Sequence, residues 1–156
     1  MRPGVRLAVD VGTVRVGLAR SDAGGILALP LETLTRQDDA SEINEIVRYA
    51  NELEVIEIIV GLPRHMRGGE GISAKGARRY ARKLKMVLPE CRVCLVDERL
   101  SSHEVHERLL QAGVERREHR QMIDQVAASI ILETALEMER MSGRAPGKEL
   151  VLEEGQ

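Results

Sequence analysis

Three acidic residues occupy positions where carboxylates could cooperate in catalysis. Asp10 ends the first apolar run, in the stretch "LAVDVGTVRVGLARSD". The pair Asp97 and Glu98 ends the last apolar run of strand type, in "RVCLVDE". Side chains at strand ends commonly line a ligand crevice in α/β proteins. Asp124 is the third candidate and lies in the long helical pattern near the C-terminus.

Asp124 is the most informative of these acids. On a helix, residues three, four and seven positions apart share a face. The residues that share the face of Asp124 are apolar: Ala127, Ala128, Ile131 and Ala135. Because Glu133 and Glu137 fall largely on the opposite face, the face of Asp124 must be the buried one. A buried carboxylate without a partner is prohibitively costly, so Asp124 needs a partner.

Two explanations fit the three acids, and the residues alone leave both open. In the first, each acid is satisfied separately. Backbone amides of a turn would serve Asp10, and the N-terminus of its helix would serve Asp124. Arg99 would pair with Glu98. In the second, the acids share a hard divalent cation, which prefers carboxylate oxygens, water and phosphate. Such a site supports cleavage of phosphodiester bonds, so this explanation predicts a nuclease.

The apolar periodicity predicts the elements that would position these acids. Strands are expected over residues 5–11 and 14–18, joined by a turn at Gly12 and Thr13, and over residues 26–34, 55–63 and 92–98. Helices are expected over residues 39–54, 73–87 and 117–141, with a short helix opening at Ser101. Three antiparallel strands followed by alternating helices and strands predict an α/β fold with a mixed sheet flanked by helices.

Composition limits the class of protein. We assign residues 1–142 to one domain with its own core and residues 143–156 to a flexible C-terminal tail.

The chain holds no Phe or Trp, and its formal net charge of -2 neither demands nor excludes nucleic acid. No stretch approaches the length of a membrane span, and the start leaves no room for a cleaved signal peptide. We therefore expect a cytoplasmic protein without a membrane partner.

Cys91 and Cys94 have the C-x-x-C spacing of redox pairs and zinc sites. A redox pair sits at the start of a helix, and a zinc site needs a second pair. Here the spacing falls in a predicted strand, whose alternation directs the two thiols to opposite faces. We predict two buried, unpaired thiols.

Four ordered motifs resemble the YqgF/RuvX family. They read "DVGTVRVGLA", "GLPRHMRGGEG", "VDERLSS" and "IDQVAASIILE", and the resemblance extends to about Met141. It implies an RNase H-like fold related to the RuvC Holliday junction resolvases. It also implies a metal-dependent nuclease that processes the 5′ end of pre-16S rRNA, or a resolvase that acts on branched DNA.

The resemblance also implies roles for particular residues. It places catalytic, metal-binding acids at Asp10, at Glu98 and at Asp124, with Asp97 as the alternative at the strand-end pair. These acids would hold one or two Mg²⁺ or Mn²⁺ ions. Arg15 matches a family position suited to phosphate contact.

Further basic residues are candidates for binding nucleic acid. Arg99 also matches a family position that suits phosphate. Arg64, Arg67 and Lys75 lie in or just after a glycine-rich loop that leads into the predicted helix over residues 73–87. The N-terminus of a helix favours phosphate. Arg67 departs from the family, which often has an acid there, and this change weakens any metal role for the loop.

The expected partner is precursor ribosomal RNA or branched DNA, bound by a monomer or a homodimer. One rival is a catalytically inert RNA-binding or assembly domain with the same fold. Another is an actin-like sugar kinase or chaperone ATPase, because these proteins open with a motif similar to "DVGT". The chain has less than half the length of such enzymes and no second phosphate loop, which argues against ATP hydrolysis.

Overall fold

The computed structural model describes residues 1–63, 71–98 and 119–152, and for residues 119–124 it describes the backbone alone. The strands are β1 (Arg6–Val11), β2 (Arg15–Ser21), β3 (Ala28–Thr35), β4 (Glu57–Pro63), β5 (Arg92–Glu98) and β6 (Lys148–Glu149). The helices are α1 (Ile43–Glu52), α2 (Ile72–Val87) and α4 (His119–Ser142). Of the helices in these ranges, none is long and apolar enough to cross a bilayer.

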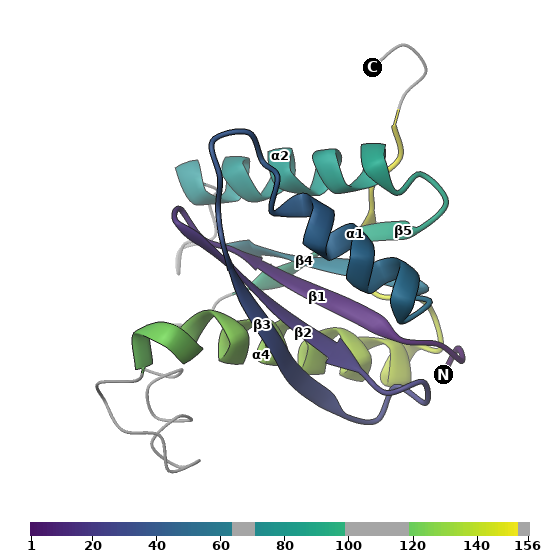
Figure 1. Ribbon diagram of the computed structural model, residues 1–156. Coiled ribbons are helices and arrows are strands. Elements are labelled where there is room, and N and C mark those ends of the chain that lie inside the picture. Colours follow the sequence, from purple (N-terminus) through teal and green to yellow (C-terminus); the bar gives the residue numbers. More distant parts are fainter. Residues whose placement is uncertain (64–70, 99–118, 153–156) are drawn as a thin grey trace.

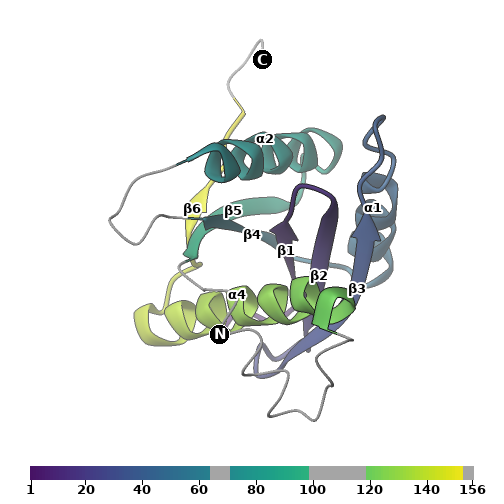
Figure 2. The same cartoon turned by 90° about the vertical axis from the view of Figure 1, so that its left-hand side faces the viewer.

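The six strands form one mixed sheet in the order β3-β2-β1-β4-β5-β6. β2 pairs antiparallel with β1 and β3, whereas β4 runs parallel to β1 and β5. Helices α1 and α2 cover one face of this sheet and α4 covers the other (Figures 1 and 2). The predicted mixed sheet with three antiparallel strands and flanking helices is confirmed. The short helix expected at Ser101 lies outside the described residues.

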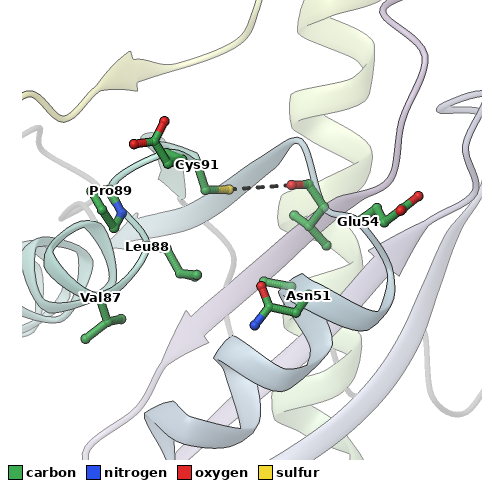
Figure 3. A pocket seen from close by; sticks show the side chains of 9 residues that line it. Asn51, Glu54, Val87, Leu88, Pro89 and Cys91 are labelled. Atoms are coloured by element: carbon green, nitrogen blue, oxygen red, sulfur yellow. Dashed lines mark hydrogen bonds between the residues drawn. The ribbon is translucent and has the colours of Figure 1, made fainter.

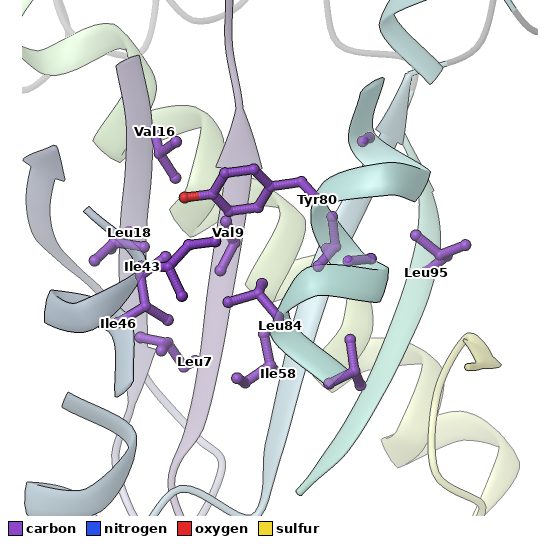
Figure 4. Packing of buried hydrophobic residues seen from close by; sticks show 14 of the residues in the cluster. Leu7, Val9, Val16, Leu18, Ile43, Ile46, Ile58, Tyr80, Leu84 and Leu95 are labelled. Carbon is purple, nitrogen blue, oxygen red and sulfur yellow. The ribbon is translucent and has the colours of Figure 1, made fainter. Parts of the chain in front are cut away.

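Side chains that alternate along the strands divide the core into two layers. The first layer lies under α1 and α2 and is built from large aliphatic side chains, including Leu7 and Val9 of β1 (Figure 4). Tyr80 of α2 is almost fully buried in it, and its hydroxyl donates to Glu42 at 3.1 Å. α1 begins three residues after Ala40, which adopts a left-handed φ of 60° and so starts the helix later than predicted.

The second layer lies under α4 and contains smaller side chains. Ala8 of β1 and Ala19 of β2 have no exposed surface there. The α4 residues that meet them are Ala128, Ile131, Leu132, Ala135 and Leu136. Short strand side chains let the helix lie close to the sheet, because its backbone is not held away by bulk. The predicted buried face of the last helix is confirmed from Ala127 onward, with Glu133 and Glu137 exposed. The side chain of Asp124 lies outside the described residues.

The sequence prediction missed a strand in the stretch after residue 142. Lys148–Glu149 form β6, which pairs antiparallel with β5, and the Leu150 amide donates to the Val93 carbonyl at 2.8 Å. Arg92 also donates to the Pro146 carbonyl at 2.7 Å. The prediction of a loose tail therefore does not hold for this strand, because backbone pairing with the edge of β5 fixes it.

The two cysteines are free and lie on opposite faces of the sheet, as predicted. Cys91 is half-buried and packs on the first layer, while Cys94 is buried in the second. Burial raises the pKa of the Cys94 thiol to about 12. Both therefore act as small apolar side chains.

A buried ion network ties the amino end of β1 to the last turns of α4. Glu139 accepts hydrogen bonds from the Arg2 side chain at 2.7 Å and from Arg6 at 3.0 Å. Arg2 also donates to Glu57 of β4 at 3.0 Å. Burial alone would raise the pKa of Glu139, but the hydrogen bonds from Arg2 and the charge of Arg6 lower it to about 2. This network fixes where α4 crosses the sheet.

We expect Glu139→Gln to destabilise the fold by about 3 kcal/mol at neutral pH, because it leaves the buried Arg6 without its counter-charge. Urea unfolding would measure the loss. Glu137→Gln, on the same helix but exposed, is the matched control and should cost less than about 1 kcal/mol. The difference between the two variants should shrink as the pH falls from about 4.5 through about 2, where Glu139 takes up its proton. Equal effects of the two variants would contradict the role of the network.

Candidate active site

Asp10 and Glu98 lie on the same face of the sheet, the face covered by α4. Along β1, Ala8 belongs to the layer under α4, and Asp10 follows it two residues later. Along β5, Val96 belongs to the same layer, and Glu98 follows it two residues later. Because β1, β4 and β5 are parallel neighbours, their carboxyl ends meet at one edge. The structure thus brings two of the three predicted acids together.

Gly61 of β4 makes the room that Glu98 occupies. A Cβ atom at Gly61 would stand 3.0 Å from Glu98 Oε2 and would overlap Cδ1 of Ile131 on α4. Glu98 therefore lies directly over the bare backbone of the central strand, under the helix. Sequence reasoning did not select Gly61, although a glycine near the end of a buried strand is a signal of close approach.

The surroundings of Glu98 disfavour its charged form. Burial, and then the negative charge of Asp10, raise the pKa of Glu98 from 4.5 to about 8. Two like-charged carboxylates in one half-buried site resist simultaneous ionisation. Perturbed carboxyl groups of this kind are typical of active sites and cation sites.

Asp97 lies on the other face of the sheet. Its neighbours along β5 at alternate positions, Val93 and Leu95, pack in the layer under α1 and α2. It lines a cavity of about 370 Å³ together with Arg78 and Lys148. This position separates Asp97 from Asp10 and leaves Glu98 as the acid of the strand-end pair that faces α4.

Asp124 lies on α4, one turn before Ala128 and two turns before Ile131. These two residues pack against the sheet, so the backbone register puts Asp124 in the same helical row, about 10 Å from Ile131 along the axis. Its side chain is outside the described residues. Within the side chains that are described, no three His, Cys, Asp or Glu residues form a metal-binding group.

The predicted basic residues divide into two groups. Arg15 begins β2 beside the turn that follows Asp10 and is exposed, and Lys75 is exposed in the first turn of α2. Arg64, Arg67 and Arg99 lie outside the described residues.

A larger cavity, of about 500 Å³, lies away from this edge. It opens between the ends of α1 and α2, where Asn51, Leu88 and Cys91 line it (Figure 3). The Cys91 thiol donates to the Val55 carbonyl at 3.7 Å, and burial raises its pKa. A protonated thiol is a poor nucleophile, so this cavity lacks the chemistry of the acidic edge.

The fold and the acidic edge define an RNase H-like protein. The chain resembles RuvC of Thermus thermophilus, solved in complex with a Holliday junction substrate. That likeness has a TM-score of 0.57 at 16% identity and covers 94% of this chain and 99% of RuvC.

The sequence comparisons are more specific. Residues 4–138 match the sequence model of the RuvX family, described as Holliday junction resolvase. A proposed pre-16S rRNA nuclease of Streptomyces avermitilis is 45% identical over 148 residues, which cover 95% of both chains. A relative from Kineococcus radiotolerans with the same name is 46% identical over 149 residues, covering 95% of this chain and 79% of its own. The chain belongs to the RuvX family. The names of its relatives agree with a hydrolase that acts on phosphodiester bonds.

The raised pKa of Glu98 predicts a pH dependence of stability in metal-free protein. The folded state holds the Glu98 proton more tightly than the unfolded state does. The contribution of this carboxyl group to the free energy of unfolding is therefore complete below pH 4.5 and is lost as the pH rises through about 8. Urea unfolding in chelator should show this decline in the wild type and not in Glu98→Gln, whose amide does not ionise. Asp10→Asn should reduce the decline without abolishing it, because burial is the larger cause. Parallel curves for wild type and Glu98→Gln would contradict the assignment.

Gly61→Ala tests the room made for Glu98. The new methyl group would press on both Glu98 Oε2 and Ile131, so we expect nuclease activity to fall at least roughly tenfold while the fold is retained. Thermal unfolding and cleavage would be measured together. Gly61→Ala combined with Ile131→Val relieves only the contact with the helix. The double variant should recover thermal stability but not cleavage. Recovery of both would show that Gly61 serves only the packing of α4 and not the placement of Glu98.

Proposed function

We propose that this protein is a metal-dependent nuclease that hydrolyses phosphodiester bonds in structured nucleic acid, at the 5′ end of pre-16S rRNA. The observation that carries the proposal is the placement of Asp10 and Glu98 on one face of the sheet, with Glu98 close to the bare backbone of Gly61. Asp10 and Glu98 share a half-buried site, where burial and the charge of Asp10 raise the pKa of Glu98. A cation bound between them would favour the ionised form of Glu98 and offset the repulsion of the two carboxylates.

The donor set fits a hard divalent cation. Carboxylate oxygens are the ligands that Mg²⁺ and Mn²⁺ prefer, and both ions keep coordination positions for water and phosphate. Asp10 and Glu98 would hold the ion, and Asp124 is the third acid by the register of α4. When bound, the ion supplies Lewis-acid activation of the attacking water and neutralises charge on the phosphate.

The protein's own residues set the geometry of this site. Asp10 is fixed by a strand paired on both sides, with Gly17 of β2 as its partner residue. The Glu98 carboxylate lies close to the bare backbone of Gly61, on the face where Ile131 of α4 also packs. In the metal-free protein Glu98 holds a proton up to about pH 8, so ion binding at neutral pH must release it.

The relatives' names favour precursor rRNA as the substrate, since they match nearly the whole chain at 45% identity. A role in rRNA processing would place the protein in the cytoplasm. Branched DNA is the second candidate, because the family is described as a Holliday junction resolvase.

The side chains suit either structured substrate. Tyr49 and Tyr80 are the only aromatic residues of the chain. Tyr80 is buried, and the Tyr49 hydroxyl bonds Glu32. Without aromatic platforms for stacking unpaired bases, contacts fall on the backbone and shape of the nucleic acid.

The decisive experiment compares cleavage of a labelled pre-16S 5′-leader RNA with that of a four-way DNA junction, each with Mg²⁺, with Mn²⁺ and with chelator. We expect metal-dependent cleavage of the RNA. Asp10→Asn, Glu98→Gln and Asp124→Asn should each lower the rate roughly a hundredfold or more, since changes even to groups that only hydrogen-bond a metal ligand cost about ten- to a hundredfold.

Asp97→Asn is the matched control, because it removes a neighbouring carboxylate on the opposite face of β5. It should cleave within a few fold of the wild type. Full metal-dependent cleavage by Asp10→Asn would show that the mechanism is wrong. Binding of both substrates without cleavage under every condition would favour the inert assembly domain.

A further inference from the structure

A second polar cavity lies at the same edge of the sheet as the acidic pair, between the β1–β2 turn and α2. It has a volume of about 200 Å³, and Gly12, Thr13, Arg36, Ser73 and Arg79 are among the residues that line it. Gly12 follows Asp10 by two residues, a chain distance of about 7 Å. The cavity therefore adjoins the candidate active site from the side of the sheet that α2 covers.

Contacts with Gly12, Val14 and Tyr80 fix the position of Arg36 in this cavity. Its guanidinium donates to the Gly12 carbonyl at 2.9 Å and lies 5.2 Å from the centre of the Tyr80 ring. Its amide donates to the Val14 carbonyl at 2.8 Å. Tyr80 is in turn fixed by its hydrogen bond to Glu42. A guanidinium has five donors, so the bond to Gly12 leaves others for a ligand.

Arg79 approaches from α2 and is exposed. One turn earlier on the helix is Gly76, where a Cβ atom would meet, among the described residues, only Arg79 Nη2 within 4 Å, at 3.9 Å. Among the residues that the structure describes, no carboxylate pairs with Arg36 or with Arg79. Two guanidinium groups from different elements thus share one small cavity without a counter-charge in the described part of the chain.

The start of α2 adds backbone donors to the same cavity. Its N-cap residue, Gly71, has no side chain to cap the helix, and the first turn holds no acid. The first amides of a helix have no partner within it, and its dipole favours an anion there. Ile72 and Ser73, the first two residues of α2, line the cavity. The positive end of the α2 dipole and the two arginines therefore all contribute positive potential to this cavity.

We propose that this cavity binds a backbone phosphate of the nucleic acid strand, next to the phosphate at the acidic pair. The proposal rests on the proposed nuclease function for the identity of the ligand. Bidentate guanidinium groups and helix amides are the groups that recognise phosphate in proteins. The cavity would fix the register of the strand and make no contact with the bases.

The test is the salt dependence of binding, measured in chelator so that no cleavage occurs. The probes are the labelled pre-16S 5′-leader RNA and the four-way junction, titrated between about 50 and 200 mM salt. Arg79→Gln should weaken binding of the preferred probe roughly tenfold at low salt. It should also reduce the slope of log K against log salt by about 0.7 to 0.9, the values for one phosphate contact on a single strand and on duplex DNA.

Two further variants control the measurement. Arg144→Gln removes the same charge from an exposed site after α4 and should leave the slope within error of the wild type. Gly76→Glu places a carboxylate beside Arg79, where the open space accommodates it, and should reproduce the loss seen for Arg79→Gln.

The outcomes separate this proposal from the nuclease itself. An unchanged slope in Arg79→Gln overturns the phosphate site, whether or not the wild type cleaves. A reduced slope in a protein that never cleaves supports the phosphate site and removes the nuclease. Failure of the wild type to bind either probe overturns the phosphate site.

Discussion

The close approach of α4 to the sheet is the constraint on which the site depends. Ala8, Ala19 and Gly61 present little or no side chain to the helix, so Ile131 reaches the strand backbone. A larger residue at any of these positions would lift the helix and open the space around Glu98. Burial of that carboxylate is the main reason for its raised pKa.

The position of α4 along the sheet is set at its far end. Glu139 is held by Arg2 and Arg6, so the helix is fixed at the amino end of β1 while its earlier turns cross the carboxyl end. Removal of buried charges from water is costly, and the cost is recovered only when each ion meets its partner with good geometry. A shift of α4 by one helical turn would break these ion pairs. The network therefore fixes the position along the sheet of the helix that carries Asp124.

The two faces of the sheet edge offer different chemistry within a short distance. The face under α4 gathers carboxylates, and the face under α2 gathers Arg36 and Arg79 around the start of a helix. One nucleic acid strand that crosses this edge could contact a cation held by the carboxylates on one face and place a backbone phosphate against the arginines on the other. Mixed charge of this kind is consistent with a chain whose formal net charge is only -2.

The sequence by itself determined most of the described elements and the mixed sheet, because alternation and helical periodicity report burial directly. It also predicted the three candidate acids. It also placed the two unpaired thiols on opposite faces, although Cys91 is half-buried rather than buried. Only the tertiary structure decided that Glu98 and not Asp97 lies on the face of Asp10, that Gly61 makes the room, and that Arg36 and Arg79 line one cavity. It also revealed β6. These features depend on contacts between residues far apart in the chain, and local patterns carry no information about which distant side chain will fill a given space.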